Sequence, residues 1–383
     1  MNATGNRRAK KRVRPLVCLA ITIAILLAGL WPFNFLPKNQ VTWLDGQNGV
    51  YFGRWGIAYS TEPVYGPQRA VRPGGAISIE LVVRPARELD DSIARILTLY
   101  GGGNRQFFTL AQWRSHLILR ASSRGNDLHR DYRETEAENV LLKNIPRFVT
   151  VTSRNGNTTI YADGHRTGVT GNFPILPADP FVSGKFVLGN SPGGRSPWRG
   201  DLLFLAAYDR ELSAGEVLNH FRDWTVYGTP AWLPGETPSL LYRFDERTGM
   251  TIRNHGGSRY DISMPATFHA LEKNVLFPPW QEERIDRSFI QDVVVNVLGF
   301  LPFGFSFIAW LRNHDSLKRK PLVFLVAAFG LCISLAIELL QTYLPTRTSS
   351  LTDVFSNLSG TILGAYLFRW FPLTLHVENK THR

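Results

Sequence analysis

Apolar runs long enough to cross a membrane stand at both ends of the chain, with short alternating runs between them. The first covers residues 15–31 (PLVCLAITIAILLAGLW) and follows a cluster of basic residues. It ends in Trp31-Pro32-Phe33 without a small-x-small cleavage site, which indicates an uncleaved anchor rather than a signal peptide. Three further runs, at about 290–311, 321–344 and 352–371, complete a prediction of four membrane-spanning helices.

The basic residues gather beside these apolar runs. Of the formal net charge of +12, residues 1–31 contribute +6, residues 312–320 contribute +3 and residues 365–383 contribute +2. Lysine and arginine are enriched in the cytoplasmic loops of membrane proteins. Both termini and the 312–320 loop are therefore predicted to be cytoplasmic, and the region from about 33 to 289 to lie outside. This distribution excludes nucleic acid as the expected partner. The two cysteines, Cys18 and Cys332, both lie in apolar runs and offer no disulfide framework.

The region between the first two spans has the pattern of an all-β protein. Its short runs are rich in Val, Ile, Thr and aromatic residues, alternate with polar positions and are bounded by Gly, Pro, Asn and Asp. We expect strands at 76–83, 106–110, 116–121, 148–152 and 158–163. Many short strands separated by turns predict a sandwich or jelly roll.

Several phrases in this region carry a family resemblance: ISIELVVRP (77–85), TTIYADG (158–164), FVLGN (186–190), WRGDL (198–202) and YDRELS (208–213). They resemble the concanavalin A-like or laminin G-like sandwich, in which the last phrase joins a final strand to a short closing helix. That family includes glycan-binding modules and some glycan hydrolases. A retaining hydrolase needs two carboxylates about 5–5.5 Å apart, and the chain lacks the E-x-D-x-x-E run that supplies them on such a strand. The resemblance therefore implies binding rather than hydrolysis.

Two sets of side chains in the sandwich are candidates for ligand contacts. Tryptophan faces can stack on sugar rings, although packing inside the domain is the favoured interpretation for each single tryptophan. Aspartate oxygens can bind calcium, although single aspartates in turns usually cap the turn. The candidates are Trp113, Trp198, Trp224 and Trp232 for a sugar, and Asp163, Asp201 and Asp209 for calcium.

Polar side chains recur at helical spacing inside the three C-terminal spans. An ionisable group within a membrane helix costs about 2.5–3.5 kcal/mol on insertion scales, so it is a functional candidate by default. Residues three or four apart share a helix face, and all of these fall in the outer half of the predicted bilayer. The sequence thus predicts an acidic, amide-lined pocket that opens outward. The ligand-binding candidates are Asp292, Asn296, Glu338, Gln341, Arg347, Asp353 and Asn357.

Structural roles compete with this interpretation. A role in hydrogen bonds between helices explains three amides equally well: Asn296, Gln341 and Asn357. Arg347 and Asp353 could form a salt bridge in the outer loop. Asp292 and Asp353 also stand near predicted helix starts, where a carboxylate can act as an N-cap. For Glu338, the deepest carboxylate, function is favoured.

A second set of residues is predicted to shape the bundle. Pro302 removes a backbone hydrogen bond and, with Gly304, is expected to bend the second span. Pro345 lies in the short outer loop. Gly360 and Gly364 form, with Ser356, a small-residue stripe that allows close helix packing.

Three phrases in these spans carry a second resemblance: DVVVNVLGFLPFG (292–304), ELLQTYLPTR (338–347) and DVFSNLSG (353–360). They resemble the VanZ-like membrane family, whose namesake is associated with resistance to teicoplanin. Members usually have four spans, and the first often ends in a Pro-Phe phrase, as at Pro32-Phe33. The departure is the long insertion after the first span. The resemblance implies a role in the bacterial cell envelope.

Together the two resemblances predict a multi-domain membrane protein: a four-helix bundle with an all-β jelly-roll sandwich in its first outer loop. We expect a non-enzymatic protein of the plasma membrane. Its sandwich binds a glycan or surface polymer, and its bundle pocket engages a lipid or lipid-linked headgroup and affects glycopeptide susceptibility. The expected parts are a basic tail (1–14), the first helix (15–35), the sandwich (40–270), a linker (271–289), three helices (290–371) and a cytoplasmic tail (372–383).

Two other functions remain open at this stage. In the first, the protein is a membrane enzyme in which Glu338 acts as acid or base on a lipid-linked substrate, and Asp292 and Asp353 hold a divalent cation, with no other cofactor. Against it, the spans hold no His, Ser or Cys nucleophile constellation. In the second, an intramembrane glutamate relays protons in a transporter, which with four spans would need to oligomerise.

Overall fold

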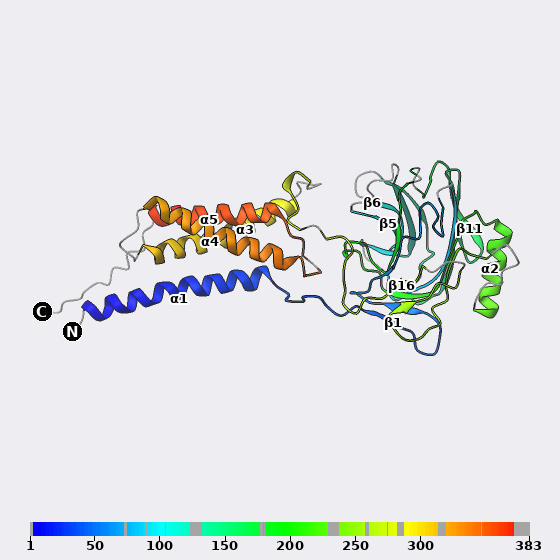
Figure 1. Ribbon diagram of the computed structural model, residues 1–383, viewed down its shortest axis with the longest axis horizontal. Coiled ribbons are helices and arrows are strands. Elements are labelled where there is room, and N and C mark those ends of the chain that lie inside the picture. Colours follow the sequence, from blue (N-terminus) through cyan, green and yellow to red (C-terminus); the bar gives the residue numbers. More distant parts are fainter. Residues whose placement is uncertain are drawn as a thin grey trace. The chain divides into compact units, whose positions relative to one another are not determined.

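In the computed structural model the chain divides into two compact units. The β unit comprises Leu36–Glu272, and the helical unit comprises Met1–Phe35 with Lys273–Arg383 (Figure 1). The predicted cytoplasmic tail at 372–383 lies outside the described residues, as does Trp232. The structure describes residues 3–72, 75–88, 91–103, 105–122, 132–176, 179, 181–228, 237–256, 260–273, 275–281, 287–312, 319–345 and 347–370, and not the side chains of 3–14, 281, 288, 319–321 and 369.

Two antiparallel sheets form the β unit, and among the described residues each has eight strands. The first sheet is ordered β1 (Val41–Trp43), β2 (Val50–Phe52), β13 (Gly200–Tyr208), β4 (Ala76–Pro85), β9 (Arg147–Arg154), β10 (Asn157–Ala162) and β11 (His165–Thr170), with β14 (Leu240–Tyr242) beside β13. The second is ordered β15 (Thr251–Ile252), β16 (Ile262–Ser263), β3 (Ala58–Ser60), β12 (Lys185–Leu188), β5 (Ile93–Gly102), β6 (Arg105–Trp113), β7 (His116–Ser122) and β8 (Tyr132–Ala137). The predicted all-β sandwich is confirmed.

Alternation along the strands decides which side chains enter the core between the sheets. In β4, Ile77, Ile79, Leu81 and Val83 belong to the main core cluster. The intervening Val82 belongs to a second cluster on the outer face of the same sheet. Successive side chains of a strand point to opposite faces, so one strand serves two apolar layers.

The helix α2 (Ala214–Tyr227) covers part of this outer face. Its start is fixed by a capping box between Ser213 and Glu216, in which each side chain bonds the other's backbone N–H. Its end is fixed by Gly228, whose φ of 71° is the left-handed conformation that glycine adopts without strain. The short closing helix that the family resemblance implied is therefore present.

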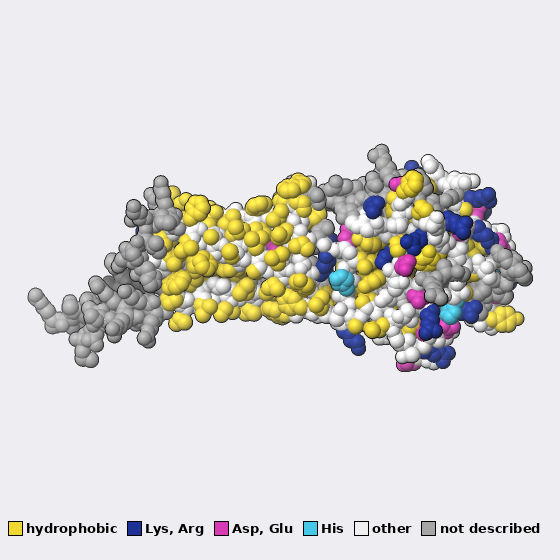
Figure 2. Space-filling model, viewed as in Figure 1, with side chains coloured by type: hydrophobic (Ala, Val, Ile, Leu, Met, Phe, Trp, Pro, Cys, Tyr) yellow, Lys and Arg dark blue, Asp and Glu magenta, His cyan; other side chains and the backbone are white. Residues whose placement is uncertain are grey.

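Four long helices form the helical unit and lie side by side in Figure 1: α1 (Ala3–Gly29), α3 (Arg287–Leu311), α4 (Arg319–Gln341) and α5 (Leu351–Trp370). A single 3-10 turn, η1 (Pro279–Gln281), precedes α3. Figure 2 shows apolar side chains over much of the visible face of this unit. Within the described residues, Phe289–Leu311 and Leu322–Gln341 are long and apolar enough to cross a membrane, and Pro15–Gly29 is a shorter apolar helix. Four spans remain a prediction.

The glycine positions explain how closely α3 and α5 pack. A Cβ on Gly304 would strike the backbone of Thr361, and a Cβ on Gly360 would strike the carbonyl of Val297. Gly364 meets the carbonyl of Leu301 in the same way. Only residues without a side chain allow two backbones this close. Pro302 lies inside α3, as the sequence places it.

Candidate functional site

The candidate site of the helical unit is built around the loop between α4 and α5. The chain segment that follows the β unit runs beside this loop: the N–H of Phe277 donates to the carbonyl of Ser349 at 2.8 Å. The N–H of Leu351 returns a bond to the carbonyl of Phe277 at 2.9 Å. The ammonium of Lys273 donates to the carbonyls of Thr342 and Leu344. Part of the predicted linker at 271–289 therefore braces the loop.

Glu338 lies in the last turn of α4 and is 1% exposed. Its Oε2 accepts the backbone N–H of Ser350 at 2.8 Å. The side chain of Ser349 bonds the same carboxylate, while its oxygen accepts the N–H of Leu276 at 3.0 Å. The buried carboxylate thus caps the loop, and the loop supplies its hydrogen bonds.

Two amides join helices to one another. Asn296 in α3 donates to Oδ1 of Asp353 in α5 at 2.8 Å. Asn357 in α5 donates to the hydroxyl of Ser334 in α4 at 2.9 Å, while its own Oδ1 is buried and has no hydrogen-bond partner among the described residues. The structure therefore brings Asn296 and Asp353 together and places Asn357 deeper, between α4 and α5.

Two further polar residues reach the end of α1. The amide of Gln341 donates to the carbonyl of Gly29 at 2.8 Å. Nε of Arg347 lies 3.4 Å from the carbonyl of Trp31. Arg347 and Asp353 are both close enough to Glu338 to act on it electrostatically. Glu338, Gln341 and Arg347 thus lie at or beside the loop between α4 and α5, which Pro345 helps to form.

Asp292 is the exception. It is exposed, and α3 begins at Arg287, so Asp292 stands beyond the first turn of the helix. The N-cap interpretation of Asp292 is therefore wrong. Asp353 is the third residue of α5 and is therefore not an N-cap either, although it lies in the first turn, where a carboxylate is favoured by the helix dipole.

In the β unit, the three aspartates considered for calcium are not brought together. Asp201 bonds Arg84, with Nε and a terminal nitrogen each 2.6 Å from Oδ2. Asp163 forms an ion pair with Arg147, and Asp209 accepts the backbone N–H of Arg72 at 2.8 Å. Burial raises the pKa of Asp209 above its usual value, against the hydrogen bond and charge of Arg72. A different group of metal-ligating side chains does converge within the described residues: Asp245, Glu246 and His255, with ligand atoms within 4.8 Å of one another.

The tryptophans differ in how far packing accounts for them. Trp198 is fully buried in the main core, and Trp224 on α2 packs against the outer cluster. Trp113 is half-buried, with the guanidinium of Arg114 4.9 Å from its ring centroid. Packing therefore accounts for Trp198 and Trp224.

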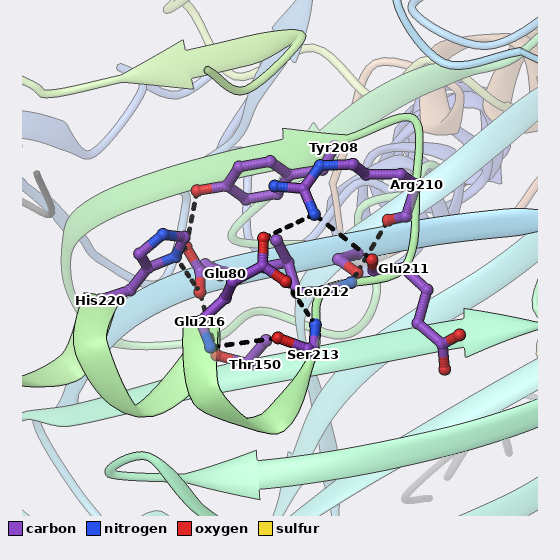
Figure 3. Close-up of polar contacts among 10 residues, drawn as sticks. Glu80, Thr150, Tyr208, Arg210, Glu211, Leu212, Ser213, Glu216 and His220 are labelled. Carbon is purple, nitrogen blue, oxygen red and sulfur yellow. Dashed lines mark hydrogen bonds and ion pairs between the residues drawn. The ribbon is translucent and has the colours of Figure 1, made fainter. Parts of the chain in front are cut away.

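Sequence reasoning missed a buried polar network beneath α2 (Figure 3). Glu80 of β4 has no exposed surface, and its carboxylate oxygens lie 3.0 and 3.1 Å from Nδ1 of His220 in α2. The hydroxyl of Tyr208 donates to Oε2 at 2.9 Å, and that of Thr150 lies 3.5 Å from Oε1. The signal was available, because Glu80 is the only charged residue in the apolar run AISIELVV.

Comparisons with known proteins match both parts of the chain. Residues 241–372 match the VanZ/LLP1 family, and residues 60–218 match the concanavalin A-like lectin/glucanases superfamily. These matches confirm the two resemblances seen in the sequence. No curated protein matches the chain.

Several solved structures are similar in part. One is a protein from Bacteroides ovatus described as carbohydrate-binding, at 14% identity and a TM-score of 0.39, covering 61% of this chain and 62% of that one. This chain therefore spans less than two thirds of that protein. Another is a SAP-like pentraxin from Limulus polyphemus, at 15% identity and a TM-score of 0.30, covering 44% and 82%. A third is the Ruminococcus gnavus IT-sialidase CBM40 bound to sialyllactose, at 14% identity and a TM-score of 0.34, covering 45% and 95%.

Proposed function

We propose that this VanZ-like protein with an inserted concanavalin A-like domain is a non-enzymatic membrane protein of the cell envelope. In the proposal, the β unit binds a glycan or surface polymer. The polar residues around the α4–α5 loop engage a lipid or lipid-linked headgroup, with an effect on glycopeptide susceptibility.

The burial of Glu338 carries the proposal for the helical unit. A carboxylate that is 1% exposed in an apolar helix needs hydrogen bonds or charge partners to remain there. Here its donors come from Ser349 and Ser350, on a loop rather than on a neighbouring helix. Arg347 on the same loop supplies positive charge, which suits the phosphate of a headgroup. A headgroup bound at this loop would therefore affect Glu338 through Ser349 and Ser350, the loop residues that donate hydrogen bonds to the carboxylate.

Four spans with the β unit outside are part of the proposal. The charge bias places both termini and the 312–320 loop in the cytoplasm. Single cysteines at Ser213 and Thr4, in a chain without its native cysteines, test this with a membrane-impermeant maleimide. Labelling of the Ser213 site alone in intact cells supports the topology. Labelling of the Thr4 site alone refutes it.

The functional experiment complements a deletion strain with wild-type protein or with Glu338→Gln, followed by challenge with glycopeptides and other envelope stresses. Gln keeps the shape of the side chain and removes its charge. Ser359→Ala is the control, because this exposed hydroxyl on α5 bonds the carbonyl of Phe355 in its own helix. We expect rescue by wild type and Ser359→Ala, and no rescue by Glu338→Gln at equal membrane abundance.

Copurified lipid, measured by native mass spectrometry of the detergent-extracted protein, provides a second readout. Glu338→Gln and Arg347→Gln should each lose lipid that wild type and Ser359→Ala retain. Equal rescue together with equal lipid content would refute the proposal for the helical unit. A glycan array with the full chain tests the β unit separately, and wild-type protein that binds no glycan would refute that part.

A further inference from the structure

A groove of about 480 Å³ opens on the β unit where the chain enters its first strand. It is lined by one segment before and within β1, one segment at β2, and one residue that precedes β13. These lining residues are Lys38, Asn39, Gln40, Thr42, Tyr51, Gly53, Arg54 and Arg199.

Strand register explains why these residues share a surface. Thr42 pairs with Tyr51, and Tyr51 pairs with Asp201 on the next strand. Phe52 and Leu202, one position away on each strand, belong to the core between the sheets. Alternation therefore puts Thr42 and Tyr51 on the outer face of the first sheet. This is the face that α2 covers further along, at Tyr208 and Phe148.

The groove is positively charged. Lys38, Arg54 and Arg199 line it, and none of its described lining residues is acidic. The guanidinium of Arg54 lies 5.1 Å from the ring centroid of Trp55, which holds it beside the opening. Three cations at one concave surface raise the local concentration of anions.

Arg199 differs from the other arginines of this face. Arg84, on the same face, bonds Asp201 at 2.6 Å. By contrast, Nε of Arg199 is buried and has no hydrogen-bond partner among the described residues. Arg199 lines the groove and forms no ion pair among the described residues, so its guanidinium can take an anionic ligand as its partner.

The remaining lining groups suit a sugar. Tyr51 is half-buried and offers a ring and a hydroxyl, while Gln40 and Thr42 are exposed and can form hydrogen bonds. Gly53 keeps the floor of the groove low, because a Cβ there would lie 2.8 Å from Oε1 of Gln40. The groove thus combines a ring surface and polar groups with three cationic side chains.

We propose that this groove binds an acidic saccharide, with its carboxylate or phosphate on Arg199 and its sugar ring on Tyr51. The inference rests on the proposed glycan binding by the β unit and names its ligand class and its site. A guanidinium binds such anions through paired N–H groups. Lys38 and Arg54, which also line the groove, attract the anion.

The test measures binding of oligogalacturonate to the full chain in detergent by isothermal titration calorimetry. Its methyl ester is the matched neutral ligand, since it replaces each carboxylate by an uncharged group that is one methyl larger. We expect the acid to bind at least tenfold more tightly than the ester. Galactose 6-phosphate, against galactose, tests whether phosphate substitutes for carboxylate.

Arg199→Gln should weaken oligogalacturonate binding at least tenfold, and Tyr51→Ala should weaken binding of acid and ester alike. Arg166→Gln is the control, because Arg166 is an exposed arginine of the same sheet on the distant strand β11. Its binding should equal that of wild type. Thermal unfolding of each variant shows that the β unit remains folded.

Each of the following results would refute a specific part of the proposal. If acid and ester bind equally, and Arg199→Gln binds as wild type, the acidic groove is refuted while glycan binding by the β unit stands. If inorganic phosphate binds as tightly as either acidic sugar, the saccharide assignment is refuted. If no glycan on a broad array and neither probe binds wild type, the inference and the proposed glycan binding fall together.

Discussion

Replacing Glu80 by alanine should strongly destabilise the β unit. The change removes the acceptor for two buried donors, Nδ1 of His220 at 3.0 Å and the hydroxyl of Tyr208 at 2.9 Å. An unsatisfied buried donor costs about 1–3 kcal/mol, so two cost about 2–6 kcal/mol. Removing one partner of a buried charged pair typically costs about 3–5 kcal/mol, and we take that range for the loss of this buried acceptor.

The assay is thermal unfolding of the full chain in detergent, followed by near-ultraviolet circular dichroism. For a domain of this size each kcal/mol lowers Tm by about 2–4 °C. Glu80→Ala should therefore lower the Tm of the β unit by about 6–20 °C. The matched control is Glu62→Ala, since the Glu62 side chain is 62% exposed and pairs with Arg69 at 3.1 Å. A surface pair contributes about 0–1 kcal/mol, so its Tm should fall by less than about 4 °C.

A double variant separates charge from packing. Glu80→Met with His220→Leu removes both partners and refills the space with apolar atoms, which is often neutral or stabilising for buried pairs. It should melt above Glu80→Ala. If Glu80→Ala instead has the same Tm as Glu62→Ala, the network does not hold α2 on the sheet, and the reasoning from buried hydrogen bonds is refuted.

Two further predictions concern the helices. Gly360→Ala should reduce the monodisperse fraction of the protein in size-exclusion chromatography, because the new Cβ would strike the carbonyl of Val297. Gly299→Ala is the control, because a Cβ there would meet nothing within 4 Å. Equal behaviour of the two variants would contradict the close packing of α3 and α5. Glu216→Gln should make the stability of the β unit less dependent on pH in the acid range. Burial opposes ionisation of Glu216, but hydrogen bonds from Ser213 and the charge of Arg210 hold its pKa below the usual 4.5. The unfolded chain therefore takes up the proton first, and the stabilisation is complete above about pH 4.5 and lost as pH falls through the folded pKa. Unchanged pH dependence in Glu216→Gln would contradict it.

Strand positions could be predicted well because alternation is a local signal. The run expected at 116–121 is strand β7, His116–Ser122, and the run expected at 148–152 lies within β9, Arg147–Arg154. Which strands lie beside one another in a sheet could not be predicted in this way. β13 lies between β2 and β4, which are more than a hundred residues earlier in the chain. No local pattern encodes that pairing, so the groove that Arg199 shares with Tyr51 could not be predicted.

The polar residues of the helices show the same limit. Spacing of three and four residues correctly indicated that Glu338 and Gln341 share one end of α4. Spacing within a helix does not say which neighbour a side chain meets. Gln341 bonds the carbonyl of Gly29, more than three hundred residues away, and Asn296 bonds Asp353. These partners depend on helix packing, which the three phrases of the family resemblance do not describe.

The most consequential difference between sequence and structure is the segment expected to be a linker. The chain leaves the β unit at Glu272, and the next residue, Lys273, already donates to the carbonyl of Leu344. Leu276 then bonds the hydroxyl of Ser349, the side chain that also bonds Glu338. A change at Lys273 would therefore alter the loop that supplies the donors to Glu338 without touching the carboxylate. The candidate site of the helical unit thus includes the first residues after the inserted domain, and a variant of Glu338 tests only its innermost part.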